Sequence, residues 1–482
     1  MVRTRGLVAM VVVTLLAVAP AAWGQWSSDP AVNLAIADLS DAQVQPKLAP
    51  TGDGGFYVSW FDNSAGGYDV YLQRLDADGV ELWAHNGILV ADRSYSSTQD
   101  YGLSIDTAGN ALLAFNDDRG GTESVTVALV SPAGIMPWGS AGVQVASSAT
   151  AFFGPPAVTG TSDGDIVVAW SQDNDMVAQK LDPSGAPLWG AGVLFHPTTG
   201  SYFVSDLHAS EAGTAILSFV TFSARTLLAQ KLGSDGSLLW AAEHVPVFDG
   251  GTLQYGNFPP FVTDGAGGAV FAWYSSSPAL QCRVQRVLAN GSEAFAHNGV
   301  EVATTASRVR VSPSAAFLPD TGETYVFWTE ADEYQTVWGV YGQKLDASGA
   351  RQWTDGGRQV VPLGANQTAN ITTLACASDA LVAWSENLSY NNDRLHVARL
   401  DSAGGFVWPS STIDIATAAI GHSRLDGSFS PAGFAAYVWE RGDYSNADVV
   451  AQNLYPAGDL GLPLFADGFE SGDTDAWSYA TP

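Results

Sequence analysis

The chain has 482 residues, of which 20 are Lys or Arg and 49 are Asp or Glu, so its formal net charge is −29. This excess of negative charge disfavours binding to nucleic-acid backbones and to anionic lipid surfaces, and we expect no nucleic acid as a partner. Charged residues make up only 14% of the chain, whereas aromatic residues make up 11% and glycines number 51. Such a balance is typical of short strands joined by tight turns.

The first residues have the composition of a secretory signal peptide. Two arginines give a basic start, an apolar run extends from Leu7 to Val18, and small residues precede Gln25. The run is shorter than the roughly 20 apolar residues that a bilayer span needs, which disfavours a membrane anchor, and no second run of that length follows. We therefore predict a signal peptide over 1–24, no membrane insertion, and a secreted protein, extracellular or at the cell surface, with the periplasm as an alternative.

One sequence pattern recurs eight times along the rest of the chain. In the first full copy, alternating apolar residues and turn residues predict four strands, at 46–49, 56–61, 69–75 and 80–90. Four antiparallel strands in each copy are typical of a β-propeller blade, so we predict an all-β, eight-bladed propeller over 25–462. The apolar residue that ends each third strand recurs at steps of 51 to 58 residues: Leu75, Val130, Leu181, Leu232, Val287, Leu345, Leu400 and Leu454.

The eighth copy ends near Gly458 without a fourth strand. A matching piece stands at the other end of the chain, where AVNLAIAD (31–38) resembles the end of a fourth strand such as NGILVAD (86–92). We therefore predict that residues 31–37 complete the last blade of a closed ring, which removes an exposed sheet edge. The alternative, seven blades with one repeat outside the ring, would leave an edge unpaired.

Aromatic and glutamine residues recur at fixed positions of the repeat. We expect the aromatic residues to pack between blades, where each would bury roughly 150 to 250 Å², and the third-strand glutamines to be buried amides that bond to turn backbone. Cys282 and Cys376 fall in different repeats, and we expect two buried free thiols. The second-strand aromatics are Trp60, Phe115, Trp170, Phe219, Trp273, Trp328, Trp384 and Trp439; the fourth-strand aromatics, absent from the eighth copy, are Trp83, Trp138, Trp189, Trp240, Phe295, Trp353 and Trp408.

Acidic and aromatic residues gather in the loops that join second to third strands. These loops and the connections between blades open on one face of a propeller, and carboxylates beside aromatic faces suit sugar hydroxyls or a hard divalent cation. A glycan and calcium are therefore the candidate ligands, and a solvated polar rim is the alternative interpretation. The candidate ligand-binding residues are Asp62, Tyr68, Asp117, Tyr274, Glu330, Tyr334, Glu386, Tyr390, Glu440 and Tyr444.

The blades resemble those of a class of uncharacterised secreted bacterial repeat proteins, which read D-G-x-G-G-x-x-x-x-W and then Q-x-L-D-x-x-G-x-x-x-W. The segments DGAGGAVFAW (264–273) and VYGQKLDASGARQW (340–353) carry the match. The second motif is also similar to the tryptophan-docking motif of quinoprotein-like propellers, although the two cysteines here are isolated and those of quinone dehydrogenases are adjacent. These resemblances imply a propeller and do not imply one activity.

The end of the chain resembles a short C-terminal tail found on many exported bacterial proteins. The resemblance rests on DGFESGDTDAWS (467–478) and implies an export or sorting signal over 463–482. The alternative is an acidic, disordered end.

The sequence assigns no catalytic residue and no required cofactor. It contains no H-E-x-x-H pair, no G-x-S-x-G elbow and no phosphate-binding loop. We expect a monomeric, non-enzymatic binding or surface-interaction propeller, whose ligand is a glycan, a divalent cation or another exported or surface protein. The alternative is an extracellular polysaccharide hydrolase or lyase that uses paired loop carboxylates.

Overall fold

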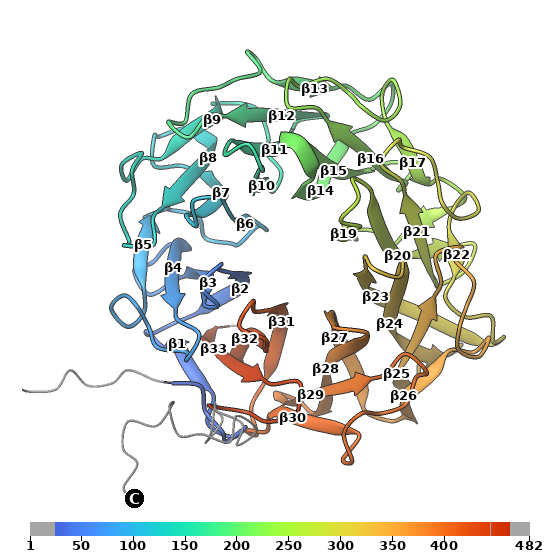
Figure 1. The fold of residues 1–482 in the computed structure, drawn as a ribbon. Coiled ribbons are helices and arrows are strands. Elements are labelled where there is room, and N and C mark those ends of the chain that lie inside the picture. The colour runs from blue at the N-terminus through green and yellow to red at the C-terminus, as the bar shows by residue number, and fades with distance from the viewer. Residues whose placement is uncertain (1–24, 444, 463–482) are drawn as a thin grey trace, which may run out of the picture.

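The strands form eight sheets that stand around a central axis (Figure 1). The computed structural model describes residues 25–443 and 445–462, so the predicted signal peptide and C-terminal tail lie outside the described residues. Seven sheets have four antiparallel strands, and the fifth sheet has five because two short strands pair with β20. The predicted all-β, eight-bladed propeller is confirmed.

Blades 1 to 4 each run from an innermost to an outermost strand in chain order. Blade 1 contains β2 (Gln43–Pro50), β3 (Phe56–Asp62), β4 (Asp69–Leu75) and β5 (Ile88–Ala91); blade 2 contains β6 (Gly102–Ile105), β7 (Ala111–Asp117), β8 (Glu123–Val130) and β9 (Val143–Ser148). Blade 3 contains β10 (Ala157–Gly160), β11 (Ile166–Gln172), β12 (Asp175–Leu181) and β13 (Val193–Phe195); blade 4 contains β14 (Tyr202–Ala209), the 3-10 helix η1 (Glu211–Gly213), β15 (Ala215–Thr221), β16 (Leu227–Leu232) and β17 (Val245–Phe248).

Blades 5 to 8 follow the same order, except that the outermost strand of blade 8 is β1, from the start of the chain. Blade 5 contains β18 (Thr252–Leu253), β19 (Phe261–Thr263), β20 (Ala269–Ser277), β21 (Gln281–Val287) and β22 (Val300–Glu301); blade 6 contains β23 (Arg308–Leu318), β24 (Glu323–Asp332), β25 (Trp338–Leu345) and β26 (Arg358–Gly364). Blade 7 contains β27 (Gln367–Cys376), β28 (Asp379–Ser389), β29 (Asn392–Leu400) and β30 (Thr412–Ala416); blade 8 contains β31 (His422–Phe429), β32 (Ala435–Asp443), β33 (Asn446–Leu454) and β1 (Leu34–Ala37).

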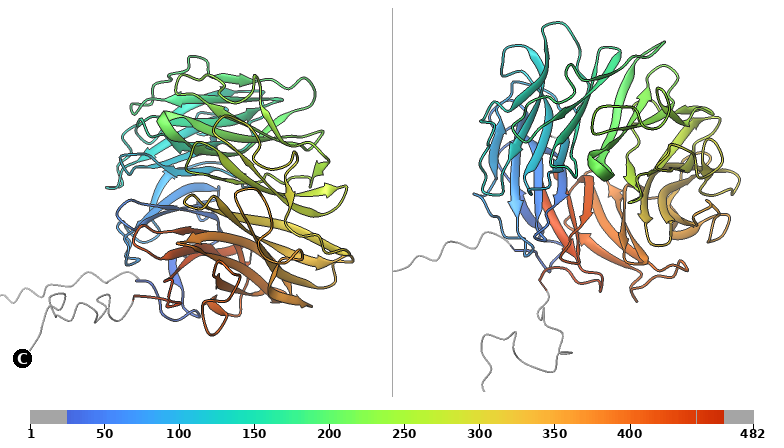
Figure 2. Two further views of the ribbon diagram at one scale, coloured as in Figure 1. Left: turned by 45° about the vertical axis from the view of Figure 1, so that its right-hand side comes forward. Right: turned by 45° about the horizontal axis from the view of Figure 1, so that its top comes forward.

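The two ends of the described chain meet in blade 8. Strand β1 pairs antiparallel with β33, with Leu34 opposite Ala451, so the sheet order is β1-β33-β32-β31. Figure 2 shows the blue start of the chain beside its red end in two further views. The predicted closure is confirmed, and the alternative of seven blades with one repeat outside the ring is wrong.

The fourth strands are shorter than the sequence suggested. In blade 1 the pattern predicts a strand over 80–90, but β5 covers only Ile88–Ala91, and before it Glu81 makes an isolated bridge to Leu75. The intervening loop carries Trp83 across to the next blade, where its Nε1 donates to the carbonyl of Pro132 at 3.3 Å. The chain therefore leaves the sheet at this point because its aromatic side chain packs on the neighbouring turn.

In five of the blades, a buried glutamine holds this loop in place. The side-chain amide of Gln73 donates to the carbonyl of Ala84 at 2.9 Å, and that of Gln179 donates to Gly190 at 3.0 Å. Buried amides need such partners, so the predicted role of the glutamines is confirmed. The same bond, to a carbonyl 11 residues further on, is made by Gln230, Gln285 and Gln343.

The core consists of apolar layers between adjacent blades. Trp60 is fully buried and packs with Val438 and Val449 of blade 8, so the first and last blades share one hydrophobic cluster. Cys282 and Cys376 are free and buried, as predicted. Among the described residues, no helix has the length and apolar character needed to cross a membrane.

Candidate functional site

The ten residues selected from the sequence do not form one cluster. They are distributed over six blades, and Tyr444 lies outside the described residues. Tyr334 and Tyr390 are 76% and 96% exposed, and neither ring contacts another aromatic ring in the described part of the chain. Tyr68 and Tyr274 are half-buried and pack against the hydrophobic layers of blades 1 and 5. The tyrosines thus supply no shared surface.

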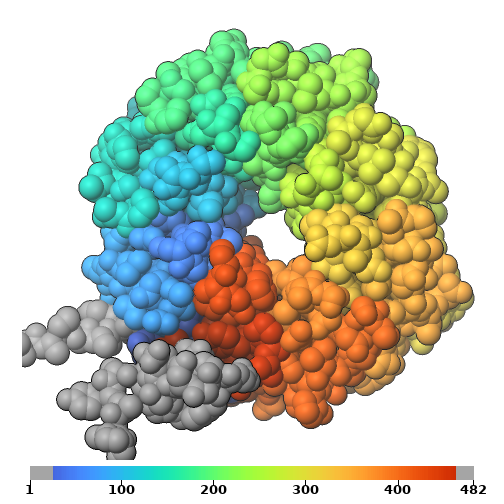
Figure 3. Space-filling view, in the orientation of Figure 1, coloured from blue at the N-terminus to red at the C-terminus, as the bar shows by residue number. Residues whose placement is uncertain are grey.

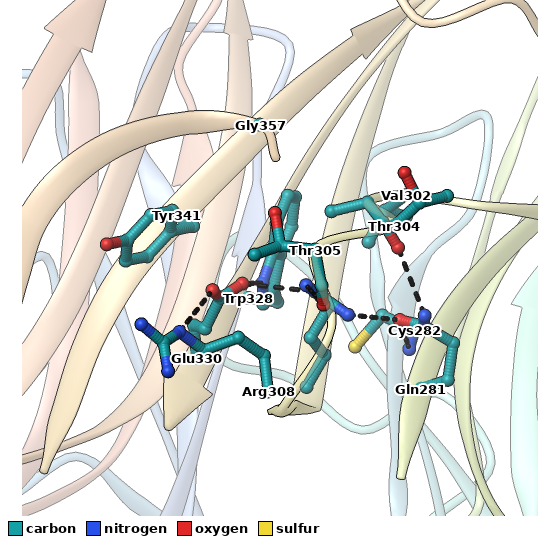
Figure 4. Close-up of polar contacts among 12 residues, drawn as sticks. Gln281, Cys282, Val302, Thr304, Thr305, Arg308, Trp328, Glu330, Tyr341 and Gly357 are labelled. Atoms are coloured by element: carbon teal, nitrogen blue, oxygen red, sulfur yellow. Dashed lines mark hydrogen bonds and ion pairs between the residues drawn. The ribbon is translucent and has the colours of Figure 1, made fainter. Parts of the chain in front are cut away.

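Glu330 is a buried ion-pair partner. Its side chain is 2% exposed and accepts hydrogen bonds from Nε of the equally buried Arg310 at 3.0 Å and from Nε1 of Trp328 at 3.1 Å (Figure 4). Nε of Arg308 lies 3.6 Å from the other carboxylate oxygen of Glu330. Desolvation raises the pKa of Glu330, although the charge of Arg310 opposes that rise. A buried carboxylate needs such partners, and here one of them is the indole of its own strand.

The remaining carboxylates also bind donors of the chain itself. Asp117 is buried and forms a 2.7 Å ion pair with Arg119, and buried Glu440 accepts from the backbone N–H of Gln45 at 2.7 Å. The half-buried Glu386 accepts from Nε2 of His396 at 3.1 Å. Buried Asp62 accepts from the backbone N–H of Ser64 at 2.9 Å. For Asp62 and Glu330 the W-x-D and W-x-E spacing signals this role, because it places the carboxylate within reach of the indole of Trp60 or Trp328.

Five aromatic rings gather instead at blades 3 to 5, on the face that carries the loops between second and third strands, which we call the loop face. We call this group of rings the aromatic platform. The ring of Phe203 lies 6.4 Å from Phe152, 5.5 Å from Phe222 and 6.3 Å from Phe258, and Phe222 lies 5.3 Å from Tyr255. Four of the rings are strongly exposed: Phe152 by 47%, Phe222 by 46%, Tyr255 by 65% and Phe258 by 41%. Contiguous exposed apolar surface of this kind marks interaction sites.

A groove leads from the platform to the centre of the ring. It has a volume of about 370 Å³, and Phe203 and Phe258 line it on the platform side, while Asp206 and His208 line it on the inner side. Those two inner residues also line the central channel, which has a volume of about 820 Å³ between the innermost strands. Figure 3 shows the opening of this channel at the centre of the molecule. Platform, groove and channel are therefore continuous.

Two charge pairs face the groove. Lys47 Nζ lies 2.8 Å from Asp100 Oδ1, and His208 Nε2 lies 3.0 Å from Asp206 Oδ2. Desolvation in the channel wall lowers the pKa of His208, but the charge and hydrogen bond of Asp206 outweigh it and raise the pKa above its usual value. Asp206 also accepts from the backbone N–H of Phe261 at 3.1 Å, which fixes the carboxylate to the next blade.

The groove is not among the sites predicted from the sequence, because most of its residues lie on innermost strands, whereas the predicted site residues follow the second strands. The available signal is the alternation in YFVSDLHA (202–209), where Asp206 and His208 share one face of strand β14. In the described part of the chain, no three His, Cys, Asp or Glu side chains gather as a metal-ligand group.

No protein-family model matches the chain, and no curated protein matches it. Solved structures with a similar fold include the Dos1 propeller, at 11% identity and a TM-score of 0.49, covering 87% of this chain and 95% of that one. A polysaccharide lyase, ulvan lyase bound to a saccharide, matches at 11% identity and a TM-score of 0.48, covering 89% and 97%.

Prolyl oligopeptidase B from Galerina marginata matches at 11% identity and a TM-score of 0.43, with 84% of this chain covered. This chain spans only 56% of the length of that enzyme. At such identities the similarity concerns the fold alone. The chain is a β-propeller protein, distantly similar in structure to propellers of various functions.

Proposed function

We propose that this protein is a non-enzymatic binding propeller that holds a neutral glycan on the aromatic platform. The observation that carries the proposal is the continuity of the five platform rings, four of them strongly exposed, with a polar groove on the same face. Binding sites commonly combine apolar and aromatic walls with a few placed polar groups. Ring faces stack on the C–H faces of sugars, and carboxylates such as Asp206 accept from sugar hydroxyls.

Charge favours a neutral glycan over the other candidates. The net charge of −29 repels polyanionic chains, and it also repels a second copy of the same chain. A neutral sugar escapes this repulsion and can donate its hydroxyls to the acidic groove. An exported protein partner would have to bind in the same negative electrostatic field.

The test is a screen of neutral glycans with the mature chain, followed by calorimetry with platform variants. We expect the double variant Phe222→Ala/Tyr255→Ala to bind the selected glycan at least about tenfold more weakly, because exposed aromatic anchors dominate such contacts. Tyr390→Ala is the matched control, since that tyrosine is 96% exposed outside the platform. Binding that survives in the platform variant, or no glycan binding at all, would contradict the proposal. A dimer that only the platform variant loses would identify the platform as a self-association surface instead.

A further inference from the structure

We propose that the central channel recognises the end of the glycan chain, with Asp206 and His208 as its contact residues. This inference rests on the proposed function, because the platform would bind the residues that precede this end. It assigns the channel a second contact of a different kind: the platform binds by stacking, and the channel binds by hydrogen bonds. The ligand is therefore a neutral glycan with an accessible terminus.

The closure of the ring restricts what can enter the channel. Strands of every blade contact strands of the next blade around the ring, and β2 of blade 1 contacts β31, β32 and β33 of blade 8, so the described blades form a continuous wall. A polymer segment in mid-chain therefore cannot slide sideways into the channel. A chain end can enter along the axis, from the groove that begins at the platform.

The two contact residues lie well inside this opening. Strand β14 is the innermost strand of blade 4 and runs along the channel wall from Tyr202, near the loop face, to Ala209. Asp206 lies three residues beyond Phe203 of the platform, which corresponds to roughly 10 Å of extended strand, and His208 lies two residues further. A chain that stacks on Phe203 can thus reach both polar residues only by extending its end into the channel.

The pair is preorganised for hydrogen bonding to hydroxyl groups. Asp206 fixes His208 through Nε2 at 3.0 Å, and no described residue bonds the other ring nitrogen, Nδ1. The imidazole is 46% exposed and lines both groove and channel. The ring of Phe261 lies 4.8 Å away at a right angle and holds the imidazole in place. The channel is therefore lined by a partly exposed imidazole that Asp206 and Phe261 hold in place.

The polar groups around the pair fit a sugar better than an ion. Lys47 and Asp100 line the same groove and neutralise one another at 2.8 Å. Asp426 lines the channel and accepts from the backbone N–H of Leu48 at 2.9 Å. Hydroxyl groups can both donate and accept in such a mixed surrounding, whereas a charged ligand would meet both signs of charge.

The experiment compares intact and shortened forms of the same neutral polysaccharides. Mixed-linkage β-glucan, glucomannan, arabinoxylan and amylose are measured before and after partial depolymerisation, at equal mass concentration. Depolymerisation adds chain ends without changing the sugars. For a glycan that binds, we expect the wild type to bind the shortened form at least about tenfold more tightly per unit mass. His208→Ala should remove this gain, so that the variant binds the intact and the shortened forms about equally per unit mass.

Two further variants serve as controls. His208→Gln retains a donor toward Asp206 and controls for a loss of folding, which thermal melting checks for each variant. His196→Ala is the matched control, because His196 forms a similar 2.7 Å pair with Asp175 but is 73% exposed on the outer part of blade 3. Equal binding of both polymer forms, or a His208→Ala variant that still prefers the shortened form, would overturn chain-end recognition but not the proposed function. Absence of all glycan binding, or binding that the platform variants leave unchanged, would overturn the proposed function.

Discussion

The indole nitrogen of Trp26 donates to the carbonyl oxygen of Ala77 at 2.8 Å. Trp83 of blade 1 makes the same bond to Pro132 in the turn of blade 2, and Trp408 of blade 7 makes it to Pro456 at 2.9 Å. Trp26 thus supplies the docking tryptophan that the eighth repeat lacks. Its ring lies against the turn at Gly79, where φ is +80° and a Cβ would approach the ring to 2.7 Å.

Replacing Trp26 should weaken the closure of the ring. Trp26 is 4% exposed, and truncation of a buried tryptophan to alanine costs about 3 to 5 kcal/mol. We expect Trp26→Ala to lower the melting temperature clearly, and Trp26→Phe to have a smaller effect because it keeps the ring and loses only the hydrogen bond. Phe295 already occupies the equivalent position in blade 5. Melting of Trp26→Ala at the wild-type temperature would show that the tryptophan does not hold the ring closed.

The buried pair of Arg310 and Glu330 should be more sensitive to single than to double substitution. Glu330→Ala leaves an uncompensated buried guanidinium and removes the acceptor of the Trp328 indole, which should cost about 3 to 5 kcal/mol. The double variant Arg310→Met/Glu330→Leu removes both charges, and we expect it to unfold closer to the wild type. Chemical denaturation of the three proteins checks this. A double variant as unstable as Glu330→Ala would refute the electrostatic explanation.

His422 should destabilise the fold in mild acid. Its Nδ1 accepts the indole N–H of Trp439 at 3.1 Å, so the ring must stay neutral, and burial lowers its pKa from 6.5 to about 4. The unfolded chain therefore binds the extra proton first. Stability is lost as the pH falls from about 6.5 toward 4, by at most about 3 kcal/mol from this group.

The variant His422→Gln isolates that contribution. Other groups also titrate in acid, but the difference between wild type and variant should shrink as the pH falls through this window. Denaturation curves at several pH values measure it. A difference that stays constant between pH 7 and pH 4 would mean that His422 does not titrate as described.

His297 should behave in the opposite way. Its hydrogen bond to Glu293, at 3.0 Å, and its bond to Asp249, also at 3.0 Å, raise its pKa above 6.5. A raised pKa gives stability that is fully present below the unfolded value and is lost as the pH rises through the folded value. An NMR titration should show a raised pKa for His297 that falls in Glu293→Gln. A titration at the ordinary value in the wild type would exclude the ion pairs in solution.

Much of the architecture follows from the sequence alone. The spacing of the third-strand residues from Leu75 to Leu454 predicts eight blades, and AVNLAIAD predicts the strand that closes them, because strand alternation and turn chemistry are local properties. The buried role of the glutamines such as Gln73 follows in the same way, since its partner lies 11 residues away in the same blade.

Only the tertiary structure decided where a ligand could bind. The sequence pointed to the carboxylates after the second-strand aromatics, yet residues such as Glu330 lie inside the blades, where ion pairing and indole bonding occupy them. The platform rings, from Phe152 to Phe258, occupy non-equivalent positions of blades 3 to 5, so no repeat pattern reveals them. Their meeting depends on how the ring curves and brings separate loops together, and a sequence repeat encodes contacts within a blade but not that curvature.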